Sequence, residues 1–90
     1  MKKKVYVVLF NSVKKIDGWY YNGSCDQFIS VEPTFDKARN VIEKAAERRL
    51  DDYEYEGIIS DADWNYIEIE IGDTWYQYFF NPIEIEVEAN

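Results

Sequence analysis

A chain of 90 residues is long enough for one folded domain, and its 47% apolar and 18% aromatic content is too high for a disordered segment. A net charge of −8 opposes direct binding of nucleic acid, and the absence of histidine removes the commonest general base and metal ligand. The single cysteine excludes an internal disulfide, and no apolar run approaches the roughly 20 residues of a membrane span. We therefore expect one cytoplasmic domain over residues 1–90, with no contact to a membrane.

The first predicted element is a strand over Val5–Phe10. All six residues are apolar or aromatic, a pattern that indicates a central strand covered at least in part on both faces. Lysines precede this run as they do in a signal peptide, but the run is shorter than the roughly 7–15 residues of a signal core. Polar residues follow it at once, so we interpret it as a strand of the folded domain.

Two turn dipeptides follow, Asp17-Gly18 and Asn22-Gly23, and each tolerates positive φ. They flank only three residues, so they cannot both be tight hairpin turns around the same strand. We expect a second strand to begin at Gly18 or Trp19, with Asn22-Gly23 forming a turn or a bulge ahead of a strand over Cys25–Val31.

A helix is predicted to begin after Thr34, whose hydroxyl can cap the first turn, since Pro33 disfavours an earlier start. Apolar residues then recur at helical spacing: Phe35, Ala38, Val41, Ile42, Ala45 and Ala46. The helix should lay this alanine-rich side on a sheet. Its end is expected between Leu50 and Glu56, and the acids there favour the earlier boundary because they oppose the helix dipole.

The C-terminal forty residues have the pattern of strands, with Gly72-Asp73 as a two-residue hairpin turn. This turn pairs Ile71 with Thr74, Ile69 with Tyr76 and Ile67 with Tyr78. The isoleucines of the first isoleucine–glutamate stripe, IEIEI, therefore share one face with two tyrosines. The other face carries the paired positions Glu70 and Trp75, Glu68 and Gln77, and Tyr66 and Phe79. The first face is predicted to be core, and the second to meet water or a partner.

A second stripe of the same kind, IEIEV over residues 83–87, follows Asn81-Pro82 and is interpreted as a further strand. Its apolar residues, Ile83, Ile85 and Val87, are expected to continue the core face, which turns Glu84, Glu86 and Glu88 outward. If this strand lies beside Thr74–Phe80, five glutamates occupy one face. The predicted fold class is α+β: an antiparallel sheet of about five strands with one helix packed on one face, in the element order β-β-α-β-β-β.

Few residues suggest chemistry. Cys25 has no histidine or second cysteine to activate it, and the neighbouring Asp26 opposes a thiolate. The segment Asp61–Asn65 reads as the D-x-D-x-N start of a calcium loop, but Tyr66 and Gly72 stand where that loop needs glycine and glutamate. No glycine-rich phosphate loop is present. We expect no catalytic residue, no metal and no cofactor.

Charge is strongly segregated along the chain. Residues 1–50 hold all ten basic residues and six acids, whereas residues 51–90 hold twelve acids and no base. A field of one sign weakens a fold by self-repulsion, and aromatic residues on the same face are typical of a contact site. The predicted partner-binding residues are the acids and their aromatic or amide neighbours: Glu54, Glu56, Glu68, Glu70, Trp75, Gln77, Phe79, Glu84, Glu86 and Glu88.

In size and charge profile the chain is similar to small acidic proteins of phages and mobile elements that block restriction or CRISPR nucleases by imitating DNA. The resemblance implies an inhibitor whose acidic sheet face occupies the basic, nucleic-acid-binding surface of a host protein. Two alternatives remain. One is a structural or adaptor domain whose acids serve only solvation, and whose partner, such as a second copy of the chain, docks on an edge strand or on the helix. The other is a small carboxylate-dependent enzyme.

Overall fold

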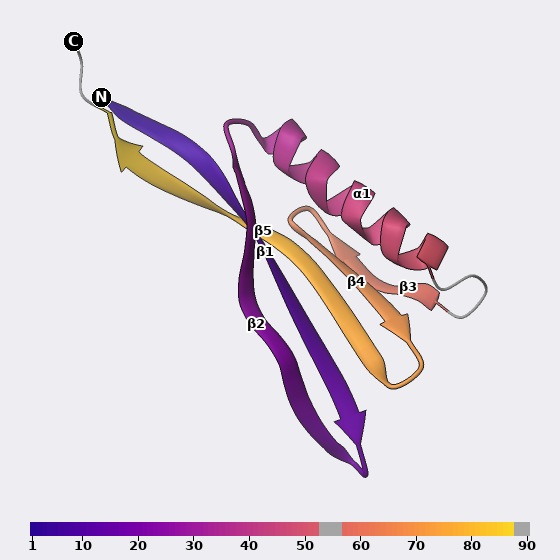
Figure 1. The fold of residues 1–90 in the computed structure, drawn as a ribbon. Coiled ribbons are helices and arrows are strands. Elements are labelled where there is room, and N and C mark those ends of the chain that lie inside the picture. The colour runs from indigo at the N-terminus through magenta and orange to yellow at the C-terminus, as the bar shows by residue number, and fades with distance from the viewer. Residues whose placement is uncertain (53–56, 88–90) are drawn as a thin grey trace.

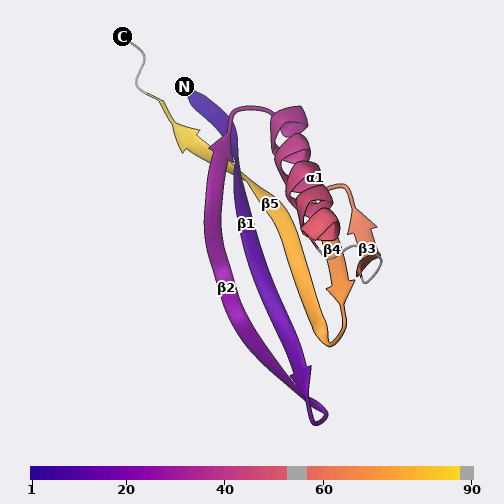
Figure 2. The same cartoon turned by 45° about the vertical axis from the view of Figure 1, so that its right-hand side comes forward.

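The computed structural model describes residues 1–52 and 57–87, without the side chains of Asn22, Ser24 and Cys25. In this part of the chain, five strands form one antiparallel sheet in the spatial order β2-β1-β5-β4-β3. One helix lies along a face of that sheet (Figure 1, Figure 2). The elements are β1 Lys2–Ile16, β2 Trp19–Glu32, α1 Phe35–Asp52, β3 Gly57–Asp63, β4 Tyr66–Ile71 and β5 Thr74–Glu86. The predicted α+β class and its element order are confirmed.

Both hairpin turns lie where the sequence predicts them. Asp17 and Gly18 have φ of 50° and 84°, the positive values of a type I′ turn, and β2 begins at Trp19. Gly72 has φ of 59°, and β4 and β5 pair in the predicted register from Ile71–Thr74 to Tyr66–Phe79. Asn22-Gly23 lies inside β2, where the register against β1 shifts, so the bulge is the correct alternative.

The helix α1 has the predicted start and end. The Thr34 hydroxyl accepts a hydrogen bond from the backbone N–H of Lys37 at 3.2 Å, and Asp52 falls in the window expected for the last residue. Ala38, Ile42 and Ala46 are buried against the sheet. The small alanine side chains let the helix lie close to the strands.

The core lies between α1 and one face of the sheet. Its sheet side consists of buried side chains from three strands: Val8, Ile67, Ile69, Tyr78 and Phe80. Ile71 and Tyr76 pack at its margin, so the predicted core face of the β4–β5 hairpin is confirmed. β1 is central in the sheet, as predicted, but in the described chain α1 covers only one of its faces.

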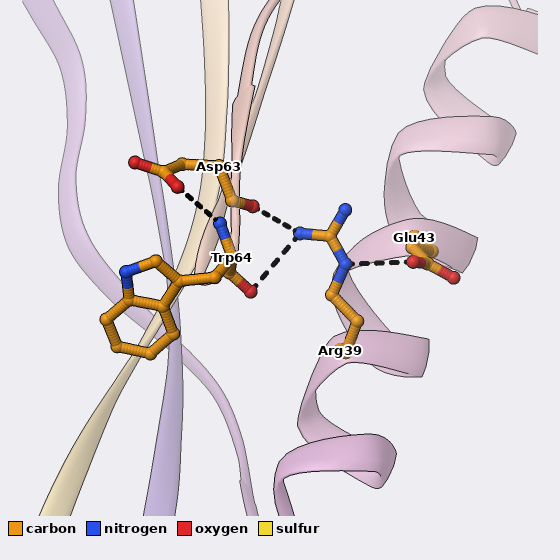
Figure 3. A network of polar contacts seen from close by, with 4 residues as sticks. All are labelled: Arg39, Glu43, Asp63 and Trp64. Atoms are coloured by element: carbon orange, nitrogen blue, oxygen red, sulfur yellow. Dashed lines mark hydrogen bonds and ion pairs between the residues drawn. The ribbon is translucent and has the colours of Figure 1, made fainter.

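The start of α1 is tied to the β3–β4 turn by Arg39 (Figure 3). Its Nη1 donates to the carbonyl oxygens of Asp63 at 2.6 Å and Trp64 at 3.3 Å, while its Nε pairs with a Glu43 carboxylate oxygen at 2.8 Å. The Trp64 ring stacks on Phe35 with ring centroids 6.2 Å apart. These contacts hold the β3–β4 hairpin beneath the helix.

Two features of the C-terminal strands differ from the prediction. Gly57–Asp63, where no strand was predicted, forms strand β3 against β4. There is also no turn at Asn81-Pro82, because β5 continues to Glu86 and pairs with β1 throughout. The five-strand count is therefore correct, but the second stripe belongs to the same strand as Thr74–Phe80.

The environment of Pro82 explains the uninterrupted strand. The N–H of Phe80 donates toward β4, to the carbonyl oxygen of Asn65 at 3.0 Å. The nitrogen of Pro82, two residues further along β5, points in the same direction. However, β4 begins opposite Phe79, so no residue of β4 lies beside Pro82. Proline removes no ladder hydrogen bond at such a free edge.

Because β5 is continuous, the residues of the second stripe lie on the opposite faces of the sheet from those predicted. Ile83 pairs with Val5, on the helix-free face, and the prediction that Ile83 and Ile85 continue the core face is wrong. Glu84 and Glu86 pair with Lys4 and Lys2, on the opposite face from Glu68 and Glu70. Five glutamates therefore do not share one face. Val87 is 37% exposed just beyond the strand, and Glu88 lies outside the described residues.

Candidate functional site

Four carboxylates lie together on the helix-free face of β3 and β4. Glu68 and Glu70 alternate with the buried isoleucines of β4, so they project away from the helix. Asp61 pairs with Glu68 across the two strands, and Asp63 pairs with Tyr66. We call Asp61, Asp63, Glu68 and Glu70 the acidic patch. In residues 1–52 and 57–87 the ion pairs are Met1–Glu86 and Arg39–Glu43, so no carboxylate of the acidic patch is in an ion pair.

Glu68 is the best-anchored member of the acidic patch. Its carboxylate accepts hydrogen bonds from the Tyr66 hydroxyl at 2.6 Å, the Ser60 hydroxyl at 2.8 Å and the Gln77 amide at 3.0 Å. Partial burial alone would raise the pKa of Glu68, but these three hydrogen bonds together outweigh it and hold the pKa below its usual value. Burial, followed by the hydrogen bond to Glu68, raises the pKa of Tyr66 well above its usual value. Glu68 is thus a fixed anion and Tyr66 a fixed donor.

Replacing Glu68 with glutamine is expected to destabilise the fold at neutral pH by about 1–2 kcal/mol, because the amide cannot accept all three hydrogen bonds. The folded pKa of Glu68 is depressed, so its stabilising effect is present above the ordinary glutamate pKa and is lost as pH falls through the folded value. The difference in unfolding free energy between wild type and Glu68→Gln, measured by urea denaturation, should therefore shrink below roughly pH 4.3.

Glu70→Gln is the matched control, since in the described residues the Glu70 carboxylate has no hydrogen bond or ion pair. Its unfolding free energy should follow that of the wild type across the acid range. A Glu68→Gln difference that stays constant from pH 7 to pH 3 would contradict the assigned network.

Aromatic and amide side chains of β5 adjoin the acidic patch. Trp75 pairs with Glu70, Gln77 with Glu68, and Phe79 with Tyr66, and all three are partly exposed. Trp75 also meets Tyr20 of β2, with ring centroids 5.8 Å apart. The face therefore combines negative charge with aromatic contact area.

Two shallow hollows flank Gln77 on this face. One, of about 370 Å³, is lined by Asn11, Asp61, Asp63, Asn65, Tyr66, Gln77 and Phe79. The other, of about 330 Å³, is lined by Val13, Tyr20, Glu68, Trp75 and Gln77. Asp61 and Asp63 are exposed, and each carboxylate accepts a hydrogen bond from the next backbone N–H. Neither lies in the apolar enclosure that prepares a carboxyl group to act as a general acid.

The structure brings together only part of the predicted site. Glu68, Glu70, Trp75, Gln77 and Phe79 share one face, as the hairpin register predicts. Glu84 and Glu86 lie on the other face, opposite lysines. The Met1 amino group is 3.6 Å from Glu86. The remaining predicted residues, Glu54, Glu56 and Glu88, lie outside the described residues.

Sequence reasoning missed Asp61, Asp63 and Tyr20. From the sequence the two aspartates were considered as the start of an incomplete calcium loop, and only the pairing of β3 with β4 places them beside Glu68 and Tyr66. The alternation Asp61-Ala62-Asp63 is the signal that could have found them, since a half-buried strand has this period. Tyr20 reaches Trp75 across β1, and nothing local in the sequence indicates that contact.

Comparison of the chain with models of protein families, with curated proteins and with solved structures finds no match in any of the three. Among the described residues, no group of three or more acid or cysteine side chains is arranged to hold a metal ion. The helix in this part of the chain lacks the apolar length that crossing a membrane requires.

Proposed function

We propose that this chain is a non-enzymatic binding protein whose acidic patch occupies a basic surface of a partner protein, of the kind that otherwise binds nucleic acid. The observation that carries the proposal is the set of four carboxylates on two adjacent strands, facing the same way and, among the described residues, in no ion pair with a base. Such an arrangement raises the local negative potential and attracts a basic partner.

The spacing of the acids supports this function. Alternate residues on a strand lie about 6.6–6.8 Å apart, and neighbouring strands are about 4.8 Å apart, so the patch is a small regular grid of negative charge. A basic groove that binds it would release the same counterions that phosphates release. Trp75 and Phe79 add the aromatic contact area that strengthens protein interfaces.

The acidic patch is smaller than the five-glutamate face expected from the sequence, and it lies on β3 and β4 rather than along β5. Mimicry of DNA, the more specific form of the proposal, therefore uses this patch and does not need Glu84 or Glu86. In the alternative function, an adaptor with a purely solvating acidic face, substitutions in the patch leave partner binding unchanged.

Capture from host lysate on the immobilised protein tests the proposal. The double variant Asp61→Asn/Glu70→Gln should reduce recovery of a basic, nucleic-acid-binding partner about ten-fold or more, since two uncompensated charges leave the contact. Recovery by the wild type should fall at high salt and in the presence of competing DNA or RNA. Quantitative mass spectrometry of the captured proteins is the measurement.

The structure supplies a matched control in Glu84→Gln/Glu86→Gln, which removes the same formal charge from the opposite face. This control should capture the partner as the wild type does. Equal losses in both variants would indicate an effect of net charge alone, and no loss in the patch variant would refute the proposal.

A further inference from the structure

A second feature of the helix-free face is a strip of apolar side chains beside the acidic patch. Val5, Val7 and Leu9 alternate along β1 away from the helix, while Tyr6, Val8 and Phe10 face the core. Val5 pairs with Ile83 on β5, and Val7 and Leu9 pair with Val31 and Phe28 on β2; these partners are 44%, 48% and 62% exposed. On the β5 side, Val7 and Leu9 pair with Asn81 and Phe79. We call these six residues, Val5, Val7, Leu9, Phe28, Val31 and Ile83, the apolar strip. An apolar sheet face of this kind is stable when another layer covers it.

The helix-free face changes character along β1. Lys3 has the same strand parity as Val5, so a base stands at one end of the apolar strip. At the other end, Asn11 pairs with Gln77, which in turn pairs with Glu68 of the acidic patch. From Lys3 to Asn11 the face therefore changes from basic through apolar to the level of the acidic patch, and Lys15, of the same parity, lies further along β1 over the Tyr20 ring.

We propose that a second copy of this chain packs face to face on the apolar strip, about a two-fold axis that crosses the strands near Val7. A two-fold interface is self-complementary, because each surface element of one copy meets its counterpart in the other. Lys3 and Asn11 each lie four residues from Val7, about 13 Å along the strand. The axis therefore brings Lys3 of each copy to the level of Glu68 in the other, and the apolar strips to one another.

The charges favour this occupant in spite of the net charge of −8. The acidic patches of the two copies lie about 26 Å apart along the strands, roughly three Debye lengths at physiological ionic strength. The acidic patch lies two strands to the side of β1. The long lysine side chain spans part of that offset.

The size of the helix-free face around the strip predicts a weak dimer. β1 and β5 over the roughly 27 Å from Lys3 to Asn11, with β2 alongside from Tyr6 onward, give a flat area of roughly 350 Å² per copy. Side-chain relief increases the accessible area, which then falls at the lower end of specific interfaces. We expect dimerisation at tens of micromolar protein, which corresponds to roughly 6 kcal/mol of binding free energy.

The dimer goes beyond the proposed function and uses the same acidic patch, so a basic partner and a second copy exclude each other there. Sedimentation equilibrium of the purified protein, with no partner present, measures the dimer alone. The wild type should approach twice its mass of 10.8 kDa at about 200 μM. Leu9→Glu, which places a charge in the middle of the strip, should remain a monomer at that concentration.

A charge-reversal pair makes the test specific for the two-fold geometry. Lys3→Glu and Glu68→Lys should each weaken the homodimer about ten-fold, because each variant places like charges at both symmetry-related contacts. An equimolar mixture should dimerise again, because each copy then meets an opposite charge at both contacts. Circular dichroism of each variant checks that the fold is retained.

Three outcomes would overturn the dimer: a wild type that stays monomeric at about 200 μM, a Leu9→Glu variant that dimerises as the wild type does, or a mixture that remains monomeric. None of them changes the result of lysate capture with the Asp61→Asn/Glu70→Gln variant. A failed capture likewise leaves the sedimentation result intact, so the two proposals are tested separately.

Discussion

Replacing Phe80 with alanine is expected to lower the free energy of unfolding by about 3–5 kcal/mol. The Phe80 side chain is fully buried between the sheet and the start of α1. Its ring makes edge contacts with Tyr6, Phe35 and Trp64, at centroid distances of 5.8, 5.4 and 5.9 Å. Removing the ring leaves a cavity that these larger side chains cannot fill without breaking their own packing. Small domains are stable by about 5–15 kcal/mol, so the variant should be partly unfolded at 37 °C.

Phe79→Ala is the matched control for this substitution. Phe79 is the next residue in β5, but it points to the helix-free face and is only partly buried. Its replacement should lower the free energy of unfolding by about 1 kcal/mol. Urea denaturation of both variants measures the difference. Equal losses would contradict the assignment of β5 faces, on which the candidate site also depends.

Arg49→Ala should destabilise the protein by about 2 kcal/mol, an unusually large effect for an arginine near the surface. The Arg49 guanidinium lies over the Tyr76 ring, 4.2 Å from its centroid, and 5.6 Å from that of Phe10. Its Nε donates to the hydroxyl of Tyr78 at 3.0 Å. Because Tyr78 is only 5% exposed, water cannot readily replace the lost donor.

Three further variants separate the contributions of Arg49. Arg48→Ala removes an exposed neighbouring guanidinium and should change stability by less than about 0.5 kcal/mol. Arg49→Lys keeps the charge but loses the planar group, so it should recover only part of the loss. Tyr78→Phe combined with Arg49→Ala measures the hydrogen bond by a double-mutant cycle. A zero coupling energy would show that ring stacking alone anchors Arg49.

Local signals in the sequence predicted the elements whose geometry is set by neighbouring residues. The turn at Gly72-Asp73 determined the pairing of every residue in the β4–β5 hairpin, since a two-residue loop leaves one register. Thr34 determined the start of α1 through its hydroxyl, and the alanine spacing determined the buried side of that helix. Half of the candidate site, Glu68, Glu70 and their partners on β5, follows from this hairpin alone.

The errors lie where the correct answer depends on a strand far away in the sequence. Gly57–Asp63 shows strand alternation only at Asp61-Ala62-Asp63, too short a run to predict a strand by itself, and it pairs along the edge of β4. Pro82 indicates a turn when read locally, yet it is harmless where β5 extends past the end of β4. Once that turn is absent, strand parity moves Glu84 and Glu86 to the opposite face and pairs them with lysines.

By itself, the sequence determined the fold class, the two hairpin turns, the helix and the two faces of the β4–β5 hairpin, because turn residues, capping and alternation act over a few residues. Only the tertiary structure decided which acids gather, that Asp61 and Asp63 belong with Glu68, and that an apolar strip shares their face. The physical reason is that a strand's periodicity defines two faces without saying what covers either. The helix covers one face of this sheet. We infer the partners of the protein from the charged and apolar residues of the helix-free face.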